Sequence, residues 1–120
     1  MYAARKLTMR KQFVALALEA KANGVDDDEL YSGAVEPAVT LGDFSTAEQL
    51  YDEYMRLHAP DAPDPFVHEQ YGEALQGLGR KEEAIQTFTD VLNQKGVSND
   101  VIIIAKERLR ELETNPVRSD

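Results

Sequence analysis

The sequence contains no cysteine among its 120 residues and only two histidines. The lack of cysteine excludes disulfides, thiol catalysis and cysteine-based zinc or iron–sulfur sites. Long apolar runs are also missing. The longest is six residues, Phe13 to Leu18, far short of the roughly 20 that a membrane-spanning helix needs.

Basic residues are few: 13 lysines and arginines stand against 22 aspartates and glutamates, a net charge of -9. This balance argues against broad binding to a nucleic acid backbone. The chain is also 42% hydrophobic and 29% charged, so it can bury a core and has the size of one ordinary domain.

The basic residues gather near the start of the chain. Residues 1–24 hold five of them against a single acid, Glu19. A signal peptide is one interpretation, but the apolar stretch is short, and Glu19 and Lys21 follow it at once. An amphipathic helix that ends at Asn23-Gly24 fits better. Its expected apolar face consists of Tyr2, Met9, Phe13, Leu16 and Ala17.

Helix-start signals recur along the rest of the chain. Acids at 26–29, the pair Asp64-Pro65 and Ser98 each precede apolar residues at helical spacing, and Ser45 to Glu48 reads as a capping box. The signal at Ser98 predicts a helix over 99–113. The run Val101 to Ile104 leaves a β-strand open as the alternative there.

The two central helix pairs repeat at a shift of 37 residues. Leu41-Gly42 aligns with Leu78-Gly79, and Ala47 aligns with Ala84. Tyr51 aligns with Phe88 in the same register. Repeated helix–turn–helix units are typical of a solenoid.

Residues 70–88 resemble one full repeat of the tetratricopeptide family. Gly72 and Ala84 match the small close-packing residues of that family, Gly79 the turn and Phe88 the following aromatic. Residues 28–61 resemble a second, more degenerate repeat, which departs from the family by carrying Pro37 inside its first helix. A proline there should kink the helix.

This resemblance implies an all-α fold, an antiparallel helix-pair solenoid of about six helices. We expect a basic N-terminal helix over 1–24, two tetratricopeptide-like helix pairs over 25–98, a capping helix over 99–113 and a flexible tail over 114–120. Two repeats are fewer than the roughly three that usually make a stable stack, so the flanking helices are expected to contribute.

Catalytic and metal-binding patterns are absent from the sequence. No serine has a histidine at a suggestive spacing, and the glycines around Gly77 and Gly79 do not form a phosphate-binding loop. We therefore expect a protein that is not an enzyme and that needs no cofactor or metal.

In the tetratricopeptide family the first helix of each pair lines a concave groove that binds a peptide or helix of a partner protein. The resemblance places a groove of this kind in the present chain, and its glutamates should favour a basic partner. The same acidic residues also suit an ordinary solvent-facing surface. The expected lining is Glu29, Ser32, Glu36, Val39, Thr40, Glu69, Glu73 and Gln76.

Three functions remain open from the sequence. The first is an adaptor or chaperone-like protein-binding module in the cytoplasm. The second is a self-assembling structural protein, whose basic N-terminal helix docks on the acidic remainder of a neighbour or of its own chain. The third and weakest is contact of that helix with a membrane or nucleic acid, for which aromatic residues between the basic ones are lacking.

Overall fold

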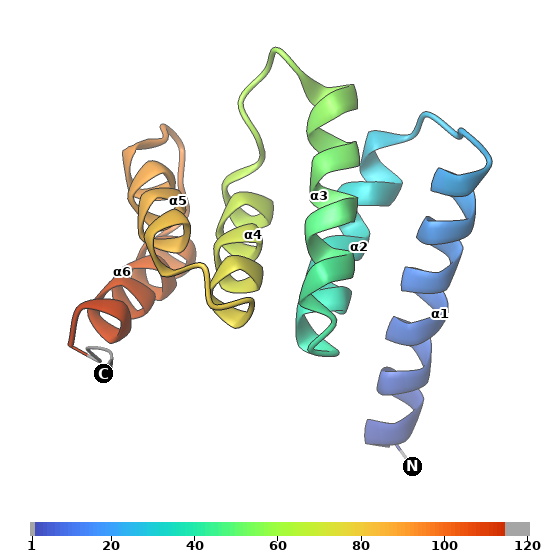
Figure 1. Cartoon of the computed structure of the whole chain (residues 1–120), viewed down its shortest axis with the longest axis horizontal. Coiled ribbons are helices and arrows are strands. Elements are labelled where there is room, and N and C mark those ends of the chain that lie inside the picture. The colour runs from blue at the N-terminus through green and yellow to red at the C-terminus, as the bar shows by residue number, and fades with distance from the viewer. Residues whose placement is uncertain (1, 115–120) are drawn as a thin grey trace. The chain divides into compact units, whose positions relative to one another are not determined.

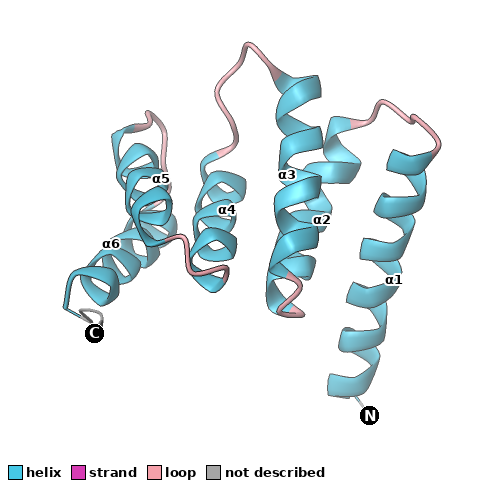
Figure 2. Ribbon diagram, viewed as in Figure 1, coloured by secondary structure: helices cyan, strands magenta, loops and turns pink. Residues whose placement is uncertain are grey.

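The computed structural model describes residues 2–114, with side chains from residue 4 onward, and every regular element in that range is a helix. The expected all-α fold with about six helices is therefore confirmed (Figure 1, Figure 2). The solenoid arrangement remains a prediction, and the expected tail beyond Thr114 lies outside the described residues. The helices are α1 (Tyr2–Ala22), α2 (Asp28–Thr40), α3 (Phe44–His58), α4 (Pro65–Gly77), α5 (Lys81–Asn93) and α6 (Asn99–Thr114).

Three of the expected helix starts are present. The side chain of Asp27 accepts a hydrogen bond from the backbone N–H of Leu30, and that of Asp64 accepts one from Val67, each at 3.2 Å. Ser98 accepts a longer bond, 3.4 Å, at the start of α6. These bonds satisfy backbone donors that the first helical turn leaves without a partner.

The expected capping box at Ser45 is wrong. Helix α3 already begins at Phe44, and the preceding Asp43 makes no side-chain cap. Ser45 therefore lies inside the helix and cannot act as its cap. The strand alternative for Val101 to Ile104 is also excluded, because these residues form the first turns of α6.

The buried face of α1 differs from the expected one. Val14 and Ala17 are buried, and Phe13 is half-buried against α2. Met9 and Leu16, however, are 60% and 55% exposed. The prediction of one apolar face is therefore only partly correct, and α1 leaves apolar side chains in solvent. The side chain of Tyr2 lies outside the described residues.

The helices pack into two compact units, the first ending at Pro63 and the second beginning at Asp64. In the first unit, α2 packs against both α1 and α3. In the second, α5 packs against both α4 and α6. This division differs from the expected one, since each unit combines a single helix pair with one flanking helix.

The core of the second unit depends on the close approach of α4 and α5. A Cβ atom on Gly72 would lie only 2.6 Å from Cε1 of Phe88, so the aromatic ring occupies the space that a side chain on Gly72 would need. Phe88 and Ala84 have no exposed surface. The small and aromatic residues of the repeat pattern therefore pack as expected.

The core of the first unit is built in a similar way around Tyr31. Its ring is fully buried, and its hydroxyl donates a 2.6 Å hydrogen bond to the carbonyl of Val25. Ala34 and Ala47 are fully buried beside it on α2 and α3. Helix α2 continues through Pro37, which is buried and faces α1.

His58 connects the end of α3 to the start of α2. Its Nδ1 lies 3.1 Å from Oδ2 of Asp28, and its Nε2 lies 3.0 Å from the carbonyl oxygen of Ala62. Only the protonated ring can donate to both acceptors. The hydrogen bond to Asp28 accordingly raises the pKa of His58 above its usual value.

We expect Gly72→Ala to lower the free energy of unfolding by about 1–2 kcal/mol, because the added methyl group overpacks against Phe88. This loss should occur although alanine gains up to about 1 kcal/mol of helix propensity over glycine. Urea denaturation followed by circular dichroism measures the change. Gly77→Ala, at an exposed position of the same helix, should not destabilise. Equal effects of the two substitutions would contradict this packing.

Candidate protein-interaction surfaces

The five candidate groove residues on α2 all keep solvent-exposed surface. They follow one another at helical spacing, on the side of α2 opposite to the buried residues Tyr31, Ala34 and Ala38. The five are Glu29, Ser32, Glu36, Val39 and Thr40. The first unit thus presents this largely polar face to solvent.

The carboxylate of Glu36 is compensated from within the chain. Nη2 of Arg10, on α1, lies 3.5 Å from Oε2 of Glu36. The hydroxyl of Thr40 donates a 2.6 Å hydrogen bond to the same oxygen. Glu36 therefore contributes less negative charge to this face than the sequence indicates.

The three candidates on α4 do not share one environment. Glu73 and Gln76 are partly exposed, whereas Glu69 has no exposed surface at all. The expectation of a solvent-facing carboxylate at Glu69 is therefore not met. Within the second unit, its carboxyl group instead contacts Gln70 and Glu73.

Burial is the largest cause that raises the pKa of Glu69 far above its usual value, followed by the hydrogen bond and the charge of Glu73. Gln70, which donates a 2.9 Å bond to Oε1, and Arg108 both act in the opposite direction. Oε2 of Glu69 is buried and receives no hydrogen bond. A buried Oε2 that accepts no hydrogen bond is the arrangement expected if this oxygen carries a proton and donates it to Glu73.

Glu73 is paired in the same way as Glu36. Its Oε2 lies 3.6 Å from Nε of Arg108 on α6, and Arg108 also donates a 3.1 Å bond to Glu111. Glu36 and Glu73 are 37 residues apart, at the same position of the repeat. In each unit, an arginine of the flanking helix thus pairs with the glutamate at this position.

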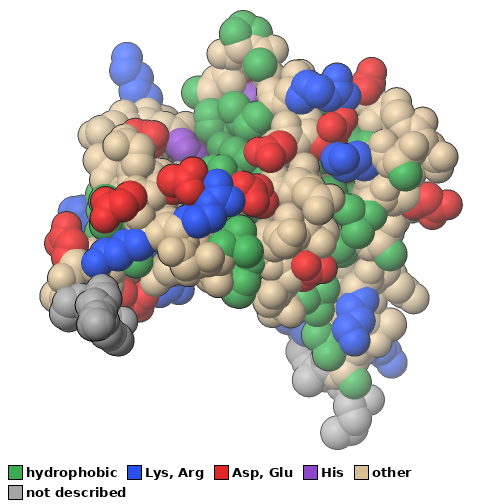
Figure 3. All heavy atoms as spheres, in the orientation of Figure 1, with side chains coloured by type: hydrophobic (Ala, Val, Ile, Leu, Met, Phe, Trp, Pro, Cys, Tyr) green, Lys and Arg blue, Asp and Glu red, His purple; other side chains and the backbone are tan. Residues whose placement is uncertain are grey.

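These pairings change the electrostatic character expected of the groove. Of its four glutamates, two are paired with arginines, and burial raises the pKa of Glu69 above its usual value. On the face drawn in Figure 3, acidic and basic side chains lie beside one another. Only Glu29, at the exposed start of α2, remains a carboxylate for which the structure gives no cationic partner among the described residues.

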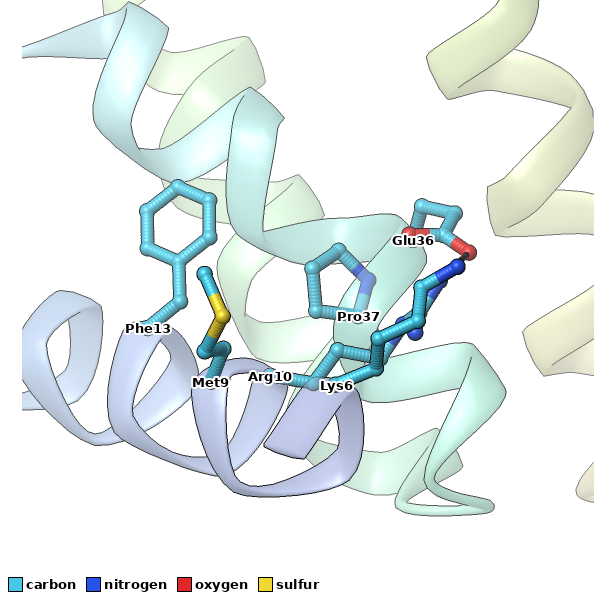
Figure 4. A pocket seen from close by; sticks show the side chains of 6 residues that line it. All are labelled: Lys6, Met9, Arg10, Phe13, Glu36 and Pro37. Atoms are coloured by element: carbon cyan, nitrogen blue, oxygen red, sulfur yellow. Dashed lines mark hydrogen bonds and ion pairs between the residues drawn. The ribbon is translucent and has the colours of Figure 1, made fainter. Parts of the chain in front are cut away.

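A pocket of about 410 Å³, which the sequence did not indicate, lies between α1 and α2. Its apolar wall consists of Met9, Phe13 and Pro37. Figure 4 shows the side chains of Lys6 and Arg10 extending from α1 toward Glu36 on α2. The sequence places Lys6, Met9, Arg10 and Phe13 three or four residues apart, but nothing in it shows that α2 closes the other side.

The described residues contain no group of three or more histidine, aspartate or glutamate side chains placed to hold a metal ion. None of the helices described is long and apolar enough to cross a membrane. The comparisons with protein-family models, with curated proteins and with solved structures found no match to this chain.

The raised pKa of Glu69 predicts that stability falls as pH rises. Above about pH 4.3 the unfolded chain releases a proton that folded Glu69 retains. The free energy of unfolding should then decrease by on the order of 1 kcal/mol per pH unit. His58 acts in the same direction near neutral pH, since its pKa is raised as well.

The variant Glu69→Gln, which stays neutral and can still donate to Glu73, should flatten this decrease between about pH 5 and 8. Thermal unfolding at a series of pH values measures this change of stability with pH. The exposed control Glu82→Gln should follow the wild-type curve. A slope that Glu69→Gln leaves unchanged would show that Glu69 is ionised in the folded protein.

Proposed function

We propose that the chain is a non-catalytic protein-interaction module of the helical-repeat type, with an adaptor or chaperone-like role. The supporting observation is that seven of the eight candidate groove residues keep exposed surface on α2 and α4. The opposite sides of these helices are buried in the cores. The scaffold thus leaves largely polar helix faces uncovered, as a binding module requires.

The proposed ligand is a peptide or helix of a partner protein. The exposed carboxylate of Glu29 favours a basic residue in that segment. Because Glu36 and Glu73 are already paired, hydrogen bonding through side chains such as Ser32 and Gln76 should matter as much as charge. A tetratricopeptide-like solenoid remains part of this proposal, as does a cytoplasmic location.

The double variant Glu29→Lys, Gln76→Lys tests the proposed face without touching buried groups. We expect it to capture at least roughly tenfold less of the proteins that the wild-type chain retains from a cell extract, as measured by quantitative mass spectrometry. The matched control Glu82→Lys, Gln86→Lys makes the same change at exposed positions of α5. If all three proteins capture the same set equally, α2 and α4 do not bind the partner through these faces.

Self-assembly through α1 is the second candidate, and the exposure of Leu7 and Leu16 favours it. Removing residues 1–24 would be a poor test, because Val14 and Ala17 are buried in the first unit. Sedimentation velocity of the full chain and of Leu7→Gln, Leu16→Gln is the better comparison. We expect both proteins to be monomers. If the full chain associates and the double variant does not, self-assembly through α1 is established instead.

A further inference from the structure

We propose that the pocket between α1 and α2 binds an acidic segment of a partner protein, one in which a carboxylate lies next to an apolar side chain. The inference rests on the proposed function as an interaction module and adds a second contact surface to it. The pocket is lined by four residues of α1 and two of α2, namely Lys6, Met9, Arg10, Phe13, Glu36 and Pro37.

The apolar wall of the pocket is held in place by close packing. A Cβ atom on Gly33 would lie 3.2 Å from Cζ of Phe13, so the ring of Phe13 packs directly on the backbone of α2. Met9 remains 60% exposed beside it. Burying a solvent-exposed methionine and the adjoining ring edge favours an apolar side chain in this position.

Arg10 has more hydrogen-bond donors than the described part of the chain supplies with acceptors. A guanidinium group carries five N–H donors, but the acceptor that Arg10 reaches is Glu36, at the long distance of 3.5 Å. Nε of Arg10 is buried and makes no hydrogen bond. Glu36 is shared with Thr40. The Arg10 side chain is 29% exposed, so a further carboxylate can approach the outer part of its guanidinium with better geometry than Glu36 has.

Charge complementarity identifies the ligand as acidic. Two cationic side chains, Lys6 and Arg10, line the pocket, and Glu36 is the only acid that lines it among the described residues. The exposed Leu16, seven residues after Met9, continues the apolar surface along the same side of α1. A surface of this length suits a peptide segment better than a small anion, and Phe13, packed on Gly33, is not free to stack with a base.

The test is a titration of the full chain, labelled with ¹³C at its methionine methyl groups, with a short designed peptide of alternating glutamate and leucine. We expect the methyl signal of Met9 to shift, while that of Met55, on α3 outside the pocket, stays in place. The peptide with glutamine in place of glutamate should bind roughly tenfold more weakly, and added salt should weaken the binding of the acidic peptide.

Arg10→Gln should weaken binding of the acidic peptide by roughly tenfold. Lys11→Gln removes one charge from an exposed position of the same helix, outside the pocket, and should have a much smaller effect. Circular dichroism confirms that both variants fold.

The proposal is overturned if no binding occurs, if the Met9 signal does not move, if both variants lose affinity equally, or if the glutamine peptide binds as tightly as the glutamate peptide. The Glu29→Lys, Gln76→Lys variant should bind this peptide normally, which separates the two surfaces.

Discussion

Close approach of helix backbones is the constraint on which the rest of this structure depends. Each of the six described helices buries at least one alanine completely, among them Ala17 on α1, Ala47 on α3 and Ala105 on α6. Between α4 and α5, Gly72 meets the ring of Phe88 with no side chain between them. Such contacts maximise packing at the core. They also leave the longer polar side chains on the outer faces of α2 and α4.

The electrostatics of those outer faces follow from the flanking helices. Arg10 on α1 and Arg108 on α6 each reach the glutamate at the equivalent position of the adjacent repeat. These partly exposed pairs add little to stability, but they reduce the negative charge that a partner encounters. Glu69 differs from these two glutamates, since burial raises its pKa and no cation is directly bonded to it. These two faces are therefore less acidic than their sequence indicates.

Local chemistry made much of the fold predictable. Asp27, Asp64 and Ser98 act on backbone groups within three residues, so the sequence alone indicates these helix starts. The resemblance to the repeat family likewise marked Gly72 and Phe88 as packing residues, but not their contact with each other. What could not be predicted depends on packing between distant segments. The burial of Glu69 is of this kind. The burial of Val14 instead of Met9 is another example, because apolar residues occur all around α1 and do not mark one buried face.

The position of Met9 has a chemical consequence for the proposed pocket. Met9 is 60% exposed, and an exposed methionine is open to oxidation, which converts its thioether to a polar, chiral sulfoxide that reductases can reverse. Met9 forms part of the apolar wall, so the sulfoxide would place a strong hydrogen-bond acceptor where an apolar side chain of the ligand should pack. Occupancy of the pocket would then depend on the oxidative state of its surroundings, although the chain contains no cysteine.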